Sequence, residues 1–238
     1  MDIDTKIEIK TQNKRHYYDI ALLVDKPNFI KWILDLRKKW KIDKLFSPEN
    51  YNDFYSHIWK VSGKSWSSFR KDIENVRANF GRLPNFDDVI MYAIVSAEIP
   101  EGVYKSCYLE QIVEPGDPEQ EDESKYKYAI IVTPNTTLDD LAEVLKKYKS
   151  KIKVGLKQKK NKDEMDKAVA EYKFELGPNY TPPPHGIDNV IRDRNWYWLK
   201  KKHSYSKVLE LTKKQDEVIS RDGVIKAIKA YTERLVES

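Results

Sequence analysis

Residues 188–235 read DNVIRDRNWYWLKKKHSYSKVLELTKKQDEVISRDGVIKAIKAYTERL, and their apolar side chains recur at the three- and four-residue spacing of helices. This spacing predicts a first helix over Asp188–Lys202 and a short second helix that begins near Tyr205. Ser220 has the residue type and the position of an N-cap for a third helix. The apolar face of that third helix would comprise Val224, Ile225, Ile228, Tyr231 and Leu235. The stretch therefore predicts an all-α three-helix unit.

Basic side chains fall on the outer surface of these three helices. Lys200–Lys202 end the first helix, and Arg221 and Lys226 lie outside the apolar face of the third. In a helix-turn-helix module the N-terminal residues of the last helix reach base edges, and flanking Lys and Arg hold phosphates. The aromatic residues 196–198 are predicted to pack in the core, because aromatic side chains at helical spacing usually do.

Three segments of this stretch resemble a known family. RDRNWYWL at 192–199, SYSKV at 204–208 and ISRDGVIKAIK at 219–229 are similar to the three helices of resolvase- and transposase-type helix-turn-helix domains. The resemblance covers about residues 188–235, roughly a fifth of the chain, and implies duplex DNA binding by a Ser-Arg-x-x-Val recognition helix. The candidate DNA-binding residues are Ser220, Arg221, Asp222, Lys226, Lys229, Tyr205, Lys207, Lys200, Lys201 and Lys202.

The connection between the second and third helices departs from this family. Residues 212–219, TKKQDEVI, make it about five residues longer than the usual tight turn. Either the second helix is longer than usual or the turn has become a loop. The angle at which the last helix docks on DNA depends on which of the two holds.

Residues 1–175 resemble no family known to us, and their pattern predicts an N-terminal domain that is mainly α with a small antiparallel β-sheet (α+β). The run 17–24 fits either a buried strand or a short helix. Four other predicted helices begin at Pro27, after Ser47, after Asn85 and after Thr137. Two more are predicted over residues 66–80 and near 163–174. The predicted strands lie within 3–9, 103–113 and 126–132, the last two flanking an acidic loop at 114–124.

A proline-rich segment gives the clearest predicted domain boundary. Residues 177–186, GPNYTPPPHG, hold four prolines and two glycines and are predicted to form a stiff linker. The predicted division is therefore an α-rich domain at 1–175, a linker at 176–187 and a helix-turn-helix domain at 188–238.

The net charge of +5 hides an asymmetry along the chain. Residues 1–145 hold 20 Lys and Arg against 25 Asp and Glu, whereas residues 146–238 hold 23 against 13. Eleven lysines fall in the Lys-rich segment 146–173. Such an asymmetry is a hint of a nucleic-acid-binding part. The acidic loop 114–124 has the charge to mask that basic part in the free protein.

We find no catalytic motif, and we expect no enzyme activity, cofactor or metal site. Cys107 is expected to be a small buried apolar residue rather than a nucleophile. Gly63–Ser65 lacks the upstream glycine of a P-loop. The acid pairs 87–88 and 139–140 open predicted helices, where carboxylates favour the positive end of the dipole. The histidines are scattered, at His16, His57, His185 and His203.

The composition indicates a soluble globular protein. Charged residues make up 34% of the chain, and no run approaches the roughly 20 apolar residues of a membrane-spanning helix. A single Cys excludes an internal disulfide framework. The first residues lack the pattern of a secretory signal, so we expect a cytoplasmic protein that is nucleoid-associated if it binds DNA.

We therefore expect sequence-specific binding of double-stranded DNA, by a transcriptional regulator or an accessory factor in recombination or replication of a mobile element. We expect the N-terminal domain to mediate either homodimerisation or contact with a partner, and we expect no membrane partner. Two alternatives remain open. One is a protein–protein adaptor with a basic helical bundle, and the other is an RNA-binding protein in which Tyr126 and Tyr128 stack on bases.

Overall fold

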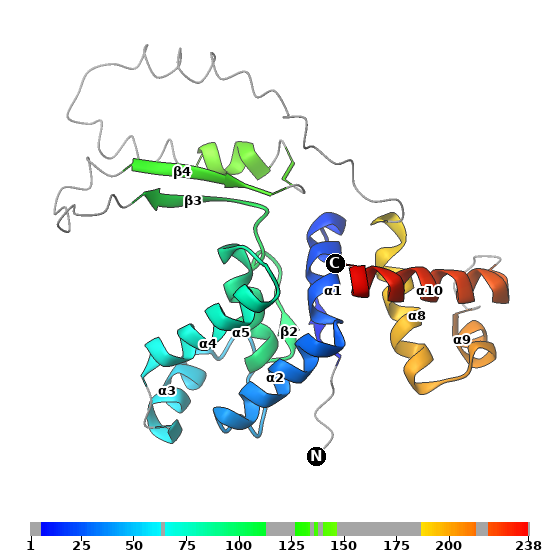
Figure 1. The fold of residues 1–238 in the computed structure, drawn as a ribbon, viewed down its shortest axis with the longest axis horizontal. Coiled ribbons are helices and arrows are strands. Elements are labelled where there is room, and N and C mark those ends of the chain that lie inside the picture. The colour runs from blue at the N-terminus through cyan, green and yellow to red at the C-terminus, as the bar shows by residue number, and fades with distance from the viewer. Residues whose placement is uncertain are drawn as a thin grey trace, which may run out of the picture. The chain divides into compact units, whose positions relative to one another are not determined.

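The computed structural model describes residues 6–62, 65–112, 127–133, 136–137, 140–146, 187–212 and 219–237. These residues are mainly helical and contain two small sheets (Figure 1). The chain divides into two compact units, one made of Met1–Tyr104 with His185–Ser238 and the other of Lys105–Pro184. The mainly helical fold with a small antiparallel sheet agrees with the sequence.

The N-terminal part of the first unit is helical. Its elements are α1 (Lys14–Val24), α2 (Pro27–Lys39), α3 (Tyr51–Ser62), α4 (Trp66–Asn79), the 3₁₀ turn η1 (Pro84–Phe86) and α5 (Asp87–Val95). Asn13 caps α1 because its side chain accepts hydrogen bonds from the backbone N–H groups of Arg15 and His16, so the run 17–24 is a helix. Pro27 occupies the first position of α2, as predicted.

Two predicted helix starts lie elsewhere in the structure. The helix expected after Ser47 begins at Tyr51, and the Ser47 hydroxyl accepts a hydrogen bond from the backbone N–H of Glu49 in the preceding turn, at 3.4 Å. Asn85 lies inside η1, and Phe86 is the N-cap residue of α5. Ser47 thus supports a turn in front of α3, and Asn85 lies within the turn in front of α5.

A short parallel sheet joins the start of the chain to the end of α5. Strand β1 (Glu8–Ile9) pairs with β2 (Glu98–Ile99). Of the expected strand 3–9, residues 8–9 are in a strand and residues 6–7 are not, while residues 3–5 lie outside the described residues. The side chains of Ile7 and Ile9 are buried, in agreement with the alternating pattern.

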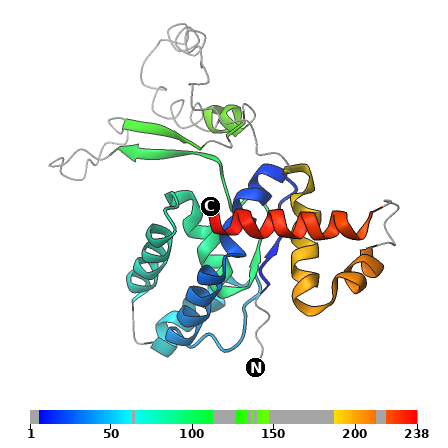
Figure 2. The same ribbon diagram turned by 45° about the vertical axis from the view of Figure 1, so that its right-hand side comes forward.

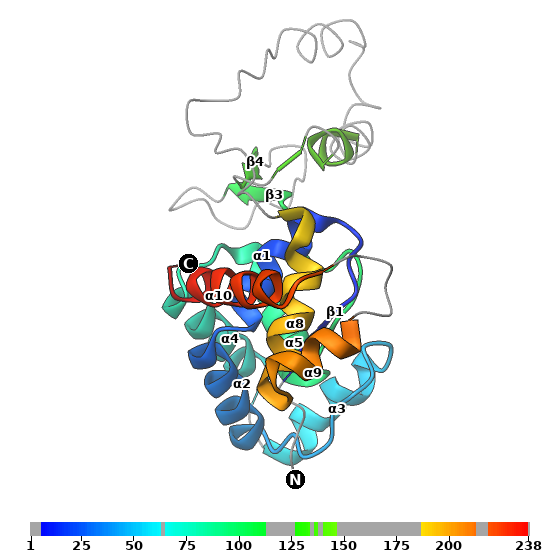
Figure 3. The ribbon, with the colours of Figure 1, turned by 90° about the vertical axis from the view of Figure 1, so that its right-hand side faces the viewer.

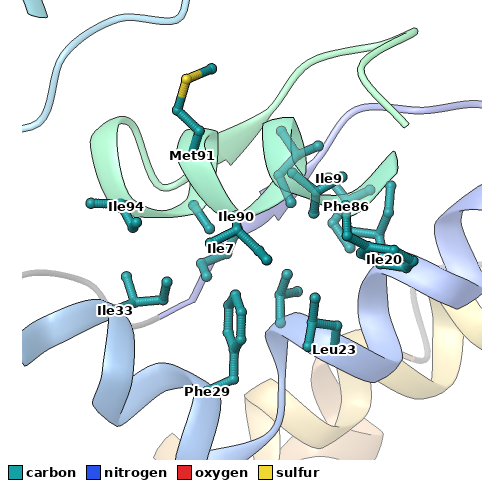
Figure 4. Packing of buried hydrophobic residues seen from close by; sticks show 14 of the residues in the cluster. Ile7, Ile9, Ile20, Leu23, Phe29, Ile33, Phe86, Ile90, Met91 and Ile94 are labelled. Atoms are coloured by element: carbon teal, nitrogen blue, oxygen red, sulfur yellow. The ribbon is translucent and has the colours of Figure 1, made fainter. Parts of the chain in front are cut away.

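The main core of the first unit gathers apolar side chains from α1, α2, α4, α5 and β1. Figure 4 shows Ile20 and Leu23 of α1, Phe29 and Ile33 of α2 and Ile90 of α5 around a common centre. These five side chains are at most 2% exposed, so the helices pack as one core.

A charged side chain of α2, Arg37, is buried next to this core. Arg37 of α2 is 3% exposed and donates from Nε to the carbonyl of Ile94 at 2.8 Å and from Nη2 to the carbonyl of Ala93 at 2.7 Å. These carbonyls belong to the C-terminal end of α5, which carries the negative end of the helix dipole. Burial lowers the pKa of Arg37 to about 10.

The second unit contains the predicted antiparallel strands. β3 (Cys107–Ile112) pairs with β4 (Lys127–Val132), with Cys107 opposite Val132. A helical segment at 140–146 follows, and Thr137 and Asp140 cap it reciprocally, each side chain accepting the other's backbone N–H. Cys107 is 3% exposed, and burial raises the pKa of its thiol, in agreement with a small core residue.

The C-terminal stretch folds into three helices, as predicted. They are α8 (Val190–Lys202), preceded by the 3₁₀ turn η3 (Ile187–Asn189), α9 (Tyr205–Thr212) and α10 (Arg221–Glu237). Figure 2 shows α10 lying across α8 and α1. The aromatic residues 196–198 are buried, as predicted. The connection 213–218, the acidic loop 114–124 and the predicted helix 163–174 lie outside the described residues.

The apolar face of α10 is shared between two clusters. Val224 and Ile228 belong to a small cluster with Trp196, whereas Tyr231 and Leu235 belong to the main core. The three helices therefore group with residues 1–104, which differs from the predicted separate domain at 188–238. The physical reason is that α8 and α10 each contribute apolar side chains to both clusters, so they pack against residues 1–104 as well as against each other and α9. The predicted linker 177–186 lies outside the described residues.

Candidate nucleic-acid interface

The N-terminal end of α10 is capped by Ser220. Its hydroxyl accepts a hydrogen bond from the backbone N–H of Gly223 at 3.0 Å, and its carbonyl accepts one from the backbone N–H of Val224 at 3.2 Å. Ser220 is thus the helix cap that the sequence predicts. Asp222 stands in the first turn, where its charge favours the helix dipole.

Three cationic side chains of α10 are exposed. These are Arg221, Lys226 and Lys229, whereas Val224 and Ile228 of the same helix are at most 5% exposed. The small apolar cluster therefore fixes which side of the helix faces solvent. Two acids of α10, Asp222 and Glu233, are exposed as well, so these five exposed side chains carry a formal net charge of +1 (three cations less two acids).

The lysines at the end of α8 have different neighbours. The Nζ atom of Lys200 lies 4.8 Å from the ring centre of Tyr205, which joins the ends of α8 and α9. The Nζ atom of Lys201 lies 4.2 Å from a ring centre of Trp198 and 4.7 Å from that of Tyr197, and both rings belong to the main core. Lys201 therefore contacts the rings of Tyr197 and Trp198, whereas Lys200 contacts that of Tyr205.

The two remaining candidate lysines are exposed. Lys207 of α9 is paired with Glu210 at 2.9 Å, so its charge is compensated within one helical turn. Lys202 is exposed and has no ion pair within the described part of the chain. The structure thus brings Tyr205 to Lys200 and leaves Lys202 and the cations of α10 facing solvent.

A buried charged network, which sequence reasoning missed, holds α8 against α1. The guanidinium of Arg194 donates from Nε to Oδ2 and from Nη2 to Oδ1 of Asp25, both at 2.8 Å. It also donates to the Ile7 carbonyl at 2.6 Å and to the Tyr17 hydroxyl at 3.2 Å. The Tyr231 hydroxyl of α10 donates to Asp25 Oδ2 at 2.7 Å. We call these five residues the Asp25 network.

Burial and charge set the ionisation of the Asp25 network. Arg194 and Asp25 are at most 1% exposed. Burial alone would lower the pKa of Arg194, but the carboxylate beside it raises that pKa above its ordinary value. Burial raises the pKa of Tyr231 well above its ordinary value, and the charge of Asp25 raises it further. The ion pair and the neutral phenol therefore persist at physiological pH.

A signal for the Asp25 network is present in the sequence. Val190, Arg194 and Trp198 recur at four-residue spacing, so the arginine lies on an otherwise apolar stripe of α8. A buried arginine needs a partner. The sequence alone does not show which of its many acids is that partner.

No protein-family model, curated protein or solved structure matches the chain. Within the described ranges, no helix is long and apolar enough to cross a membrane. In that same part of the chain, no three His, Cys, Asp or Glu side chains gather in a group that could hold a metal ion.

Proposed function

We propose that the chain binds double-stranded DNA through the N-terminal half of α10, with the lysines at the α8–α9 corner contacting the backbone. The observation that carries the proposal is that three cations of α10, Arg221, Lys226 and Lys229, are exposed on a helix whose apolar stripe is buried. A helix presented in this way fits the major groove, where its N-terminal residues meet base edges.

The polar residues at the start of α10 have matching roles in this proposal. Arg221 would donate to a guanine or a phosphate, and Asp222 would accept from a cytosine amino group. Ser220 keeps its cap, which leaves the helix start ordered. Lys226 and Lys229, one and two turns along, would hold phosphates and set the register.

The proposal extends to a role as a transcriptional regulator or as an accessory factor in recombination or replication of a mobile element. Binding by two copies on one duplex would multiply the affinity of a single module. Because α8 and α10 share a core with residues 1–104, each copy would present its DNA-binding helix from the whole unit.

A salt titration with three nucleic acids tests this function. We expect binding to duplex DNA to be tighter than to single-stranded DNA or RNA of the same sequence, and to weaken steeply with salt. Fluorescence anisotropy from about 50 to 200 mM salt measures both properties. Equal binding to all three would contradict duplex recognition, and no binding at about 50 mM salt would reject any nucleic-acid function.

A double substitution tests the assigned helix. Arg221→Ala with Lys226→Ala is expected to weaken duplex binding by about tenfold or more and to reduce the salt slope. The matched control is Lys31→Ala with Lys38→Ala, which removes the same charge from the exposed side of α2. If both pairs weaken binding equally, the effect is one of net charge and the recognition helix is misassigned.

A further inference from the structure

A groove of about 730 Å³ lies beside α8 in the first unit, and none of its lining residues belongs to α10. Its lining includes Ile191, Asn195 and Leu199 of α8, Lys6 in front of β1 and Leu211 of α9. Figure 3 shows α8 with β1 and α9 beside it. We call this feature the α8–α9 groove.

The α8–α9 groove exposes apolar side chains that the core does not take up. Ile191 is 37% exposed and Leu211 is 43% exposed, although both are large aliphatic residues. They come from different helices and line the same groove. Two such side chains in one concave site are typical of an interaction surface rather than of scattered surface residues.

The charges around the groove favour an acidic ligand. Its two acids are already compensated, Glu8 by Lys6 at 2.9 Å and Asp188 by Lys14 at 2.9 Å. Lys202 lines the groove, is exposed and has no ion pair in the part of the chain that the structure describes. A carboxylate near Lys202 would therefore meet an uncompensated cation.

We propose that the α8–α9 groove binds an acidic peptide segment of another protein, with its bulky apolar side chains on Ile191 and Leu211 and its carboxylates toward Lys202. This function goes beyond DNA binding: it shares Lys202 with the proposed DNA-binding surface and uses none of the α10 residues assigned to that surface. It makes the first unit a module that recruits a partner.

A designed peptide tests the groove directly. The probe is a fluorescein-labelled peptide of Leu and Glu, about 14 residues long, which as a helix spans about 21 Å. In one matched probe every Glu is replaced by Gln. In the other, every Leu is replaced by Ser. With the full chain, we expect both matched probes to bind about tenfold more weakly or worse, because each removes one of the two kinds of contact.

Substitutions place the peptide on the chain. Leu211→Glu is expected to weaken binding of the Leu–Glu probe at least about tenfold, since it puts a like charge in the groove. The control is Leu83→Glu, because Leu83 is 44% exposed in front of η1 and does not line the groove. Circular dichroism checks folding, and Leu211→Ser is a second variant that tests the apolar contact without added charge.

Several outcomes overturn the proposal. These are equal binding of all three probes, and equal effects of Leu211→Glu and Leu83→Glu on binding of the Leu–Glu probe. Arg221→Ala with Lys226→Ala should leave peptide binding unchanged, so the failure of DNA binding and the failure of the groove are distinguishable.

Discussion

Two arginines lie buried in the first unit, and their surroundings differ. Arg37 donates to the backbone carbonyls of Ala93 and Ile94, whereas Arg194 forms a bidentate ion pair with Asp25. Burial lowers the pKa of Arg37 to about 10, while the carboxylate raises the pKa of Arg194. Burial is similar at the two sites, so the partner decides the direction of the shift.

The two sites differ in the acceptor groups that stay buried and unpaired when the arginine is substituted. Two carbonyls at a helix end remain beside Arg37, and they are neutral acceptors. A full negative charge remains beside Arg194. Because an unpaired buried charge costs more free energy than an unpaired buried carbonyl, the two sites should respond differently to the same substitution.

The largest expected effect is that of Arg194→Met. It leaves the Asp25 carboxylate buried without a cation, and we expect the free energy of unfolding to fall by about 3–5 kcal/mol. Urea unfolding measures this change. Lys207→Met is the control, since its ion pair with Glu210 is exposed and should change stability by about 0.5 kcal/mol or less. A loss below about 1 kcal/mol for Arg194→Met would contradict the comparison.

The Tyr231→Phe substitution should have the next largest effect. It removes the hydroxyl that donates to Asp25 and keeps the ring, and we expect a loss of about 1.5–3 kcal/mol because the acceptor is charged. Tyr205→Phe is the control, since no hydrogen bond of its hydroxyl is found in the described residues. Equal urea midpoints for the two variants would show that the phenol adds nothing to the Asp25 network.

The Arg37→Met substitution should cost less than Arg194→Met. The unpaired groups are two carbonyls, for which we expect a loss of about 1–3 kcal/mol in urea unfolding. A loss equal to that of Arg194→Met would mean that the charge of the partner is unimportant. That result would break the comparison between the two sites.

At alkaline pH, the contributions of Tyr231 and Arg37 to the free energy of unfolding should change in opposite directions. The folded pKa of Tyr231 is above its ordinary value, so its contribution to stability is present below about pH 10 and is lost as the pH rises further. The folded pKa of Arg37, about 10, is below its ordinary value, so the folded chain releases that proton first and its contribution rises above pH 10.

Unfolding of three chains between about pH 9 and 11 tests these signs. The loss of stability with rising pH should be shallower in Tyr231→Phe than in the unaltered chain. It should be steeper in Arg37→Met. The reverse order, or three parallel curves, would refute the assigned directions.

The sequence predicts the local elements well because their signals are local. Pro27 at the start of α2, Ser220 at the start of α10 and the buried aromatic residues 196–198 are confirmed. The ambiguity at 17–24 was resolved by Asn13, whose cap lies just outside the apolar run. Periodicity alone does not distinguish a buried strand from a short buried helix.

The grouping of the helices was not predictable in the same way. The apolar stripe of α10 shows that Val224 and Tyr231 are buried, but it does not show that they enter different clusters. The choice of Asp25 as the partner of Arg194 depends on tertiary packing, and 38 acids in the sequence compete for that role. The exposed cations of α10 follow from the same stripe, whereas their contact with DNA stays a prediction.

The Asp25 network has a consequence for synthesis of the chain. Arg194 follows Asp25 by 169 residues, and Tyr231 follows it by 206. At about 5–20 residues per second, the ribosome needs about 10–30 s to supply the arginine after it has made the aspartate. Throughout that interval the nascent N-terminal helices would have to bury a lone carboxylate in order to close their core. We therefore expect the first unit to finish folding only after its last helices leave the ribosome.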